Sequence, residues 1–278
     1  MTPEERLAAL DRDGFVVLPG FYDVKRYVAP VQEGVQKIVQ LVARKYGIDA
    51  PAATPEQAMK EGYRAIIAAD RAYGGEIYDA VKQIPAFLAL VGSTRNAELF
   101  TQLRPGAMAG VAAGGYGIRI DNPGESKFRA WWHQEFPAQL RSIDGLIFWS
   151  PLLAVTEEMG PVGICAGSHK EGVVPVFDDD AGLNRTGAYA LRMEDEAALV
   201  ARYPRVAPLT QPGDLIVMDF LVLHESGHNV SAWPRWTMQL RYFNFNDPLG
   251  IRIGWKGSFA AGEKFGDILP ELVARKGA

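Results

Sequence analysis

Histidine is scarce in this chain: its 278 residues include only four, so each can be tested for a chemical role. His133 lies in the segment Trp131-Trp132-His133-Gln134-Glu135. On a strand, every second residue points to the same face, so a strand here would project His133 and Glu135 together. An imidazole and a carboxylate on one face can bind a metal ion between them.

A second histidine, His224, follows a long strand-like run. The turn at Pro212-Gly213 precedes the run Leu215–Leu223, and His224 comes directly after it. If this strand lies beside the segment of His133, two imidazoles and the Glu135 carboxylate share one face. Such a triad leaves open positions on its metal and is typical of non-haem Fe(II) oxygenases.

The segment that begins at Arg235 is suited to an anionic ligand, because an arginine can hold a carboxylate through two parallel hydrogen bonds. Alternation places four polar side chains on one face of this segment, those of Arg235, Thr237, Gln239 and Arg241. With Arg119 from an upstream strand, Gln239 and Arg241 indicate a polar or anionic small-molecule substrate.

Other polar residues near the histidines are further candidates. Arg119 and Asp121 share a face of a strand-like segment, where they could reach a cofactor or substrate or form an ion pair. Lys127 is a substrate-binding candidate. Gln134 and Trp149 are candidates for cofactor contact, although Gln134 would face away from His133 on a regular strand, and tryptophan beside strands is more often core.

The elements that must position these side chains change in type along the chain. Residues 1–104 are predicted to be mainly helical, with an apolar stripe at helix spacing formed by Val31, Val35, Ile38, Val39 and Val42. From about residue 105, Gly and Pro separate short strand-like runs. This order predicts an α+β fold with a helical layer packed on an antiparallel β body. We expect one domain over residues 1–278, with a helical flank (1–104), a β core (105–247) and a C-terminal extension (248–278).

Composition excludes several classes of function. A net charge of −4 provides no basic excess for general nucleic-acid binding. Cys165 is the only cysteine, so the chain forms no intrachain disulfide and no cysteine-rich zinc site. The longest apolar run is too short to span a bilayer, and the acidic start lacks the pattern of a secretion signal. We therefore expect a cytoplasmic protein that does not interact with membranes.

Four segments in order resemble the phytanoyl-CoA dioxygenase-like family of Fe(II)/2-oxoglutarate-dependent oxygenases, from near the N-terminus to about residue 247. Asp13-Gly14-Phe15-Val16-Val17 is similar to the family's opening strand. Trp132-His133-Gln134-Glu135 is similar to its first metal motif. The other two matches are Gly160-Pro161-Val162 with Ala166–Gly172, and Pro212-Gly213-Asp214 with His224-Glu225-Ser226-Gly227 and Asn229.

The resemblance implies a double-stranded β-helix (jelly roll) with an N-terminal helical layer. It also implies that His133, Glu135 and His224 hold Fe(II), and that 2-oxoglutarate chelates the iron with its far carboxylate on Arg235 and the Ser226 hydroxyl. Reaction with O2 would release succinate and CO2 and hydroxylate an unactivated C–H bond of a small molecule. Desaturation, ring closure and epimerisation remain open, as do the substrate and the oligomeric state.

One residue departs from the family pattern, because Glu135 stands where the family usually has Asp. Its carboxylate must fold back or its backbone must shift. A halogenase is disfavoured, since that chemistry needs a small residue that does not bind the metal at this position.

Two rival interpretations compete with the oxygenase. His224-Glu225-Ser226-Gly227-His228 satisfies the H-E-x-x-H pattern of zinc metallopeptidases, but that motif requires a helix, and Gly227 and the strand-like approach disfavour one. A jelly roll that binds a ligand without catalysis is the second rival. His169 and His228 are expected to have structural roles, and the segment from about Phe177 to Leu199 is a candidate lid.

Overall fold

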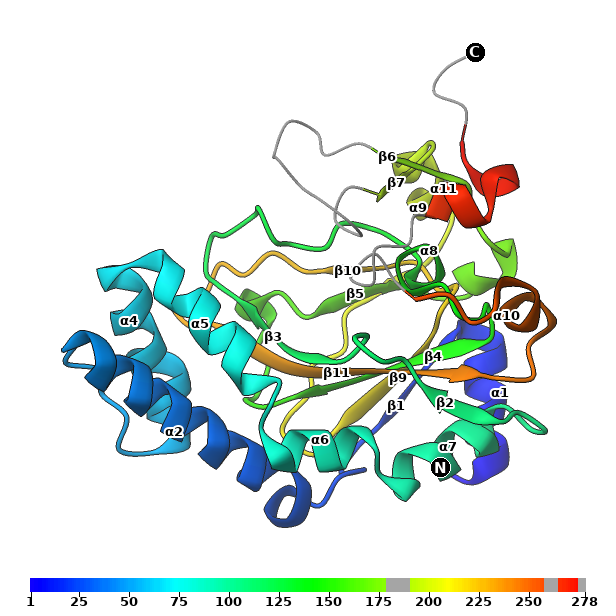
Figure 1. Cartoon of the computed structure of the whole chain (residues 1–278). Coiled ribbons are helices and arrows are strands. Elements are labelled where there is room, and N and C mark those ends of the chain that lie inside the picture. Colours follow the sequence, from blue (N-terminus) through cyan, green and yellow to red (C-terminus); the bar gives the residue numbers. More distant parts are fainter. Residues whose placement is uncertain (179–190, 258–264, 275–278) are drawn as a thin grey trace.

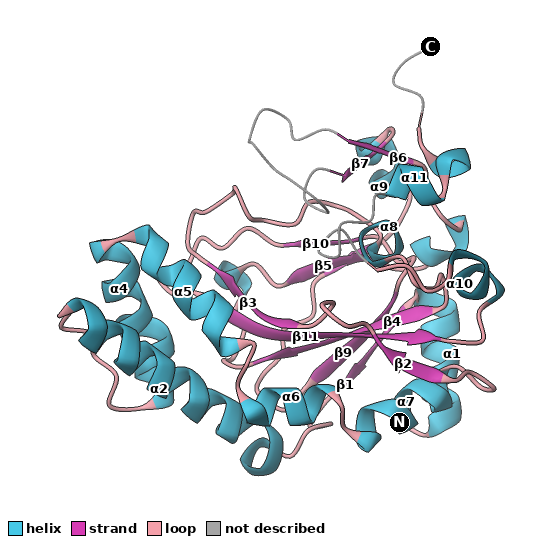
Figure 2. Ribbon diagram, in the orientation of Figure 1, coloured by secondary structure: helices cyan, strands magenta, loops and turns pink. Residues whose placement is uncertain are grey.

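The computed structural model describes residues 1–178, 191–257 and 265–274. Two antiparallel sheets lie one above the other, and helices from the first third of the chain cover the outer face of the larger sheet (Figure 1). Figure 2 shows the same division, with the helices of the first third of the chain below and beside the strands and shorter helices from the later part of the chain above them. No described helix has both the length and the apolar character needed to cross a membrane.

The helical layer forms where apolar residues recur at helix spacing. Its central helix is α2 (Ala29–Tyr46), whose buried stripe contains Val31, Val35, Val39 and Val42, and Gly47 ends it in the left-handed conformation. The Thr54 side chain caps the next short helix by accepting a hydrogen bond from the Gln57 N–H. The other helices of this region are α1 (Pro3–Asp13), α3 (Pro55–Gln57), α4 (Tyr63–Ala69), α5 (Arg71–Val81), α6 (Pro85–Val91) and α7 (Thr94–Leu103), with π-helical turns at Val24–Val28 and Ala58–Gly62.

The larger sheet has six strands in the order β1-β9-β4-β11-β2, and β3 also pairs with β11. The predicted opening strand is β1 (Phe15–Leu18). The longest strand, β11 (Arg235–Asn244), pairs along its length with β4. The remaining members are β2 (Ala109–Val111), β3 (Gly117–Asp121), β4 (Gly145–Pro151) and β9 (Leu215–Asp219).

Alternation along β11 separates the apolar core from the polar interior. Trp236, Met238, Leu240 and Tyr242 belong to the cluster that packs against the helices. The Trp236 indole donates to the Met59 carbonyl at 2.8 Å, which fastens the sheet to the helical layer. The alternate residues of β11 therefore face the space between the two sheets. A second apolar cluster there includes Ile147 and Trp149 from β4 and Ile164 from the smaller sheet.

The smaller sheet has the order β10-β5-β8 and carries the second histidine of interest. Its strands are β5 (Val162–Cys165), β8 (Arg205–Val206) and β10 (His224–Ser226). A separate hairpin, β6 (Val176–Asp178) and β7 (Leu191–Met193), lies above it near α9 (Glu196–Ala201) and α11 (Phe265–Ile268) (Figure 1). The remaining elements are α8 (Glu135–Gln139), α10 (Pro248–Ile253) and single 3-10 turns at Glu157–Met159, Ser168–Glu171 and Pro270–Leu272.

Two expected strands differ from the structure. The run Leu215–Leu223 is not one strand, because β9 ends at Asp219 and the chain turns before β10 begins in the other sheet. The segment of His133 and Glu135 is not a regular strand either. His133 makes a single bridge to His224, and Glu135 begins helix α8, because its backbone N–H bonds to the Phe220 carbonyl and not to a strand partner.

Candidate metal and co-substrate site

Among the described residues, one cluster offers three potential metal ligands: His133, Glu135 and His224. One ligand atom from each side chain lies within 4.8 Å of the other two. The three residues come from a loop, the first turn of α8 and β10, so elements of different type converge here. Glu135 and His224 are buried. Two imidazoles and one carboxylate form a set that suits non-haem iron.

The backbone fixes the two histidines relative to each other. The N–H of each residue donates to the carbonyl of the other, at 3.0 and 3.1 Å. Each imidazole also places Nδ1 against a carbonyl oxygen, Trp131 for His133 (2.6 Å) and Val222 for His224 (3.0 Å). A carbonyl can only accept, so both Nδ1 atoms carry the proton. This tautomer leaves both Nε2 lone pairs free for a metal ion.

The Glu135 carboxylate is held by Arg241, which belongs to β11. Arg241 Nε donates to Glu135 Oε1 at 3.0 Å, and Arg241 Nη2 donates to Oε2 at 3.4 Å. Glu135 Oε2 also lies 3.6 Å from His224 Nε2. The carboxylate thus faces the imidazoles with one oxygen and is tethered by its other oxygen. Arg241, a candidate for substrate binding in the sequence, is engaged with Glu135 and with the Gln239 side chain.

The electrostatic environment keeps two of these side chains, His133 and Glu135, in the protonation states that metal binding requires. Burial, with a smaller effect from nearby His224, lowers the pKa of His133 to about 3, so this imidazole is neutral at neutral pH. Burial alone would raise the pKa of Glu135. The positive charge of Arg241 and the contacts with His224 and His133 outweigh burial and lower that pKa, so the carboxylate is charged.

A second buried charge cluster surrounds Arg235 at the start of β11. Arg235 lies opposite Asp121 of β3, and its Nη2 donates to Asp121 Oδ2 at 2.9 Å. Arg119 Nε donates to the other oxygen of Asp121 at 2.8 Å. These two guanidinium groups outweigh the effect of burial and lower the pKa of Asp121. The predicted shared face of Arg119 and Asp121 is present, and the two residues form an ion pair.

Two buried polar atoms beside this cluster find no hydrogen-bond partner among the described residues: Arg235 Nε and Thr237 Oγ1. Buried polar groups are nearly always paired, so orphans in one neighbourhood indicate a missing ligand. Both atoms belong to side chains on the interior face of β11. A carboxylate, which accepts several hydrogen bonds, would satisfy both atoms. The far carboxylate of 2-oxoglutarate therefore fits the donors present.

Thr237 did not stand out in the sequence as a binding residue. Alternation placed its side chain on the same face as Arg235. A lone threonine in a strand is common, however, and only its burial without a partner indicates a role. Ser226 is buried two residues after His224 in β10, and Trp149 of β4 lies opposite Gln239 of β11.

Gln134, a candidate for cofactor contact, and Lys127, a candidate for substrate binding, contact other parts of the protein. The Gln134 amide donates to the carbonyls of Gly172 (2.7 Å) and Leu221 (2.8 Å), and its oxygen accepts from the Val174 N–H (2.8 Å). This side chain therefore links three backbone segments. Lys127 is exposed, and its ammonium group lies over the Phe128 ring.

The H-E-x-x-H pattern does not form a metallopeptidase site. His224, Glu225 and Ser226 form strand β10, so Glu225 points to the opposite face from His224 and pairs with Arg129 at 3.0 Å. Glu225 and His228 line a surface hollow on that other face. Gly227 passes so close to Gly160 that a Cβ atom on either would lie about 2.5 Å from backbone of the other segment. His169 binds the Asp11 carbonyl with its Nε2, consistent with its expected structural role.

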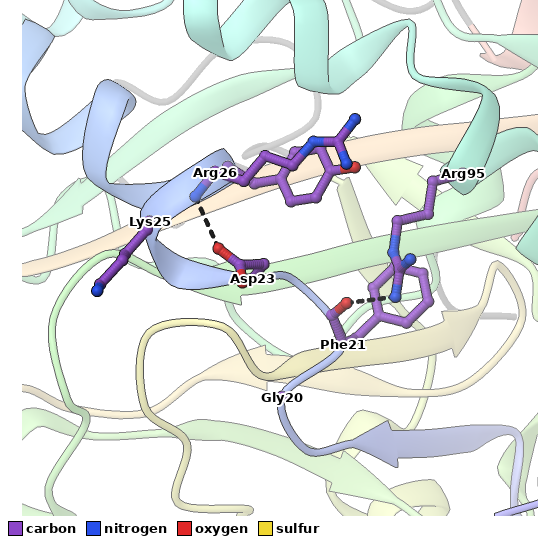
Figure 3. A pocket seen from close by; sticks show the side chains of 7 residues that line it. Gly20, Phe21, Asp23, Lys25, Arg26 and Arg95 are labelled. Carbon is purple, nitrogen blue, oxygen red and sulfur yellow. Dashed lines mark hydrogen bonds between the residues drawn. The ribbon is translucent and has the colours of Figure 1, made fainter.

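The segment that the sequence identifies as a candidate lid falls partly on residues 179–190, outside the described residues. Its described flanks form β6, β7 and α9. A hollow of about 570 Å³ opens between residues 20–27 and α7 (Figure 3). Three basic side chains line this hollow, those of Lys25, Arg26 and Arg95. They do not point toward one another, because Arg95 lies against the Phe21 ring while Lys25 points away (Figure 3).

Comparisons with known proteins agree with this geometry. A model of the phytanoyl-CoA dioxygenase (PhyH) family matches residues 10–237. The ectoine dioxygenase of Sphingopyxis alaskensis is 27% identical over 240 residues, which cover 82% of this chain and 71% of the relative.

Solved structures of low sequence identity share the fold. The structure of EctD from S. alaskensis with 2-oxoglutarate and 5-hydroxyectoine has a TM-score of 0.55 at 21% identity, covering 88% of this chain and 76% of that one. The α-ketoglutarate-dependent carbocyclase SnoK from nogalamycin biosynthesis has a TM-score of 0.55 at 17% identity, covering 88% and 86%. The predicted jelly roll with a helical layer is therefore confirmed.

The family match covers most of the chain and includes both histidine segments and Arg235. Three of these residues, His133, Glu135 and His224, lie within reach of one metal ion. This chain belongs to the phytanoyl-CoA dioxygenase family, and it is an oxygenase that depends on iron and 2-oxoglutarate.

Proposed function

We propose that the enzyme hydroxylates an unactivated C–H bond of a small polar molecule, with 2-oxoglutarate and O2 as co-substrates. The observation that carries this proposal is the convergence of His133, Glu135 and His224 beside the polar face of β11. Bound iron and 2-oxoglutarate together supply the activation of O2 that C–H oxidation needs. Succinate and CO2 are the co-products.

Different residues would bind the metal ion and the co-substrate. His133, Glu135 and His224 would hold Fe(II), with the imidazoles fixed as Nε2 ligands by their carbonyl partners. Arg235 would bind the far carboxylate of 2-oxoglutarate through its unpaired Nε, and the Thr237 and Ser226 hydroxyls are the neighbouring donors. Trp149 and the apolar cluster around it keep water from this space.

For the substrate, we infer a small polar compound. The interior face of β11 adds Gln239 to the charged residues of the site, and Arg119 lies on the adjacent strand. Ectoine, which the S. alaskensis relative's name gives as a substrate, is therefore the first compound to assay. We also propose that the chain acts as a single domain in the cytoplasm, with residues 1–104 as flank, 105–247 as core and 248–278 as extension. A buried, unpaired Cys165 suits a reducing compartment.

The test is an anaerobic titration of the metal-free protein with Fe(II) and then 2-oxoglutarate, followed by visible absorption. We expect a weak charge-transfer band that needs both additions. The His133→Ala and His224→Ala variants should lose iron, and Arg235→Ala should lose the band while retaining iron. His228→Ala is the control and should behave as wild type. Iron binding without a band would instead favour a jelly roll that does not use 2-oxoglutarate.

A further inference from the structure

We propose that Arg241 is a positioning residue for the metal site: it holds the long Glu135 side chain so that one carboxylate oxygen is presented to the two imidazoles. This inference rests on the proposed function, because it assigns Glu135 to the metal. It concerns the one position at which the chain departs from the aspartate that its sequence family usually carries.

The need for such a residue follows from the length of glutamate. Compared with aspartate, Glu135 has one more methylene and one more rotatable bond, so its carboxylate can occupy more positions. Ordering that bond costs conformational entropy. A contact that orders the side chain before the metal arrives removes this cost from the binding step.

Arg241 makes that contact with both oxygens, but unequally. Its Nε–H bonds to Oε1 at 3.0 Å, whereas its Nη2–H reaches Oε2 at the longer distance of 3.4 Å. Oε2 is also the oxygen that lies 3.6 Å from His224 Nε2. Oε1 is therefore the tethered oxygen, and Oε2 is the one turned toward the histidines.

Arg241 is itself rigidly placed. It lies in the middle of the larger sheet, where β11 pairs with β4 at Ile147. Its Nη2 also donates to Gln239 Oε1 at 2.9 Å, and its Nη1 to the Gly115 carbonyl at 3.3 Å. With Glu135 only 3% exposed, a guanidinium group fixed on three sides provides both the charge partner and the direction that this carboxylate needs.

The experiment compares wild type with Arg241→Gln, Glu135→Asp and the double variant. The metal-free proteins are titrated with Co(II) under absorption, which needs no turnover. Loss of a partner behind a metal ligand typically weakens metal binding by about 10- to 100-fold, and we expect a loss of that order for Arg241→Gln. In the Glu135→Asp background, where the carboxylate has the family's usual length, the same change should alter Co(II) affinity by less than about 3-fold.

Controls separate positioning from charge and from folding. Arg241→Lys keeps the charge but lacks the fork, so it should lose nearly as much affinity as Arg241→Gln. Arg129→Gln removes a comparable Arg–Glu pair on the other face of β10 and should leave Co(II) binding unchanged. Thermal unfolding of each variant reports folding separately.

Three results would overturn the proposal. They are an equal loss for Arg241→Gln in both backgrounds, full rescue by lysine, and tighter Co(II) binding without the guanidinium. If Glu135→Asp by itself abolishes Co(II) binding, the proposal is tested by comparing Arg241→Lys with Arg241→Gln. Similar losses of Co(II) affinity in these two variants support it, and full affinity in Arg241→Lys overturns it. Failure of wild type to bind Co(II) would count instead against the proposed function.

Discussion

Asp121 and Arg235 face each other across β3 and β11 and form a buried ion pair with a separation of 2.9 Å. The arginine nominated for 2-oxoglutarate thus already has a carboxylate partner inside the protein. Two of its donors are taken, Nη2 by Asp121 and Nη1 by the Met159 carbonyl, whereas its Nε has no partner among the described residues. A co-substrate carboxylate would have to share this guanidinium with Asp121.

Removal of the Asp121 charge should therefore strengthen 2-oxoglutarate binding. We expect Asp121→Asn to lower the Kd for 2-oxoglutarate by about 3- to 10-fold, because repulsion between two carboxylates around one arginine disappears. The measurement is the anaerobic absorption titration at saturating Fe(II). Glu225→Gln, which neutralises the carboxylate paired with Arg129, is the control and should leave the Kd unchanged. Weaker binding in Asp121→Asn would show that Asp121 orients Arg235.

Removal of the unpaired Thr237 hydroxyl should weaken 2-oxoglutarate binding without destabilising the fold. Thr237→Val keeps the shape of the side chain but removes the hydroxyl, which we place next to the co-substrate carboxylate. We expect the Kd for 2-oxoglutarate to rise by about 10- to 150-fold, the value of one hydrogen bond to a charged group. The free energy of unfolding without co-substrate should stay equal or increase, since a buried unpaired oxygen is lost. An unchanged Kd would remove Thr237 from the site.

The depressed pKa of His133 makes the stability of the metal-free protein depend on pH. In the folded protein this imidazole takes up a proton only near pH 3, against an ordinary pKa of 6.5. Between these values the unfolded chain binds the proton, so acidification favours unfolding. We expect this residue alone to lower the free energy of unfolding by about 2 kcal/mol from pH 7 to pH 5.

Urea unfolding at the two pH values checks this expectation. The His133→Asn variant has no imidazole to protonate, so its stability should fall less than that of wild type over the same interval. The difference between the two proteins isolates the contribution of His133 from that of all other groups. Parallel losses in wild type and variant would contradict the assigned pKa.

Gln134 is expected to act on folding more than on chemistry. Gln134→Leu removes three hydrogen bonds to backbone groups of Gly172, Val174 and Leu221. We expect the free energy of unfolding to fall by about 2–4 kcal/mol, while folded protein retains its affinity for 2-oxoglutarate. Gln83→Leu, which removes one exposed bond to the Asp79 carbonyl, should cost less than about 0.5 kcal/mol and serves as control. Loss of co-substrate affinity without loss of stability would return Gln134 to the binding site.

Local patterns in the sequence predicted much of the fold and the composition of the site. The stripe of α2 and the alternation of β11 follow directly from periodicity, and the motif order identified the family. The backbone around Glu135 was not predictable from alternation, because its conformation depends on the Phe220 carbonyl, a tertiary contact. The partners of Arg241 and Arg235 lie 106 and 114 residues away along the chain. Which charges neutralise each other depends on strand register, which a single sequence does not specify.

The reciprocal backbone hydrogen bonds between His133 and His224 have a consequence for the evolution of the site. The spacing of the two imidazoles is determined by main-chain atoms, which every amino acid possesses. Neighbouring side chains can therefore diverge without moving these two ligands apart. Selection for new substrates could remodel the walls of such an enzyme while its metal-binding frame stays in place.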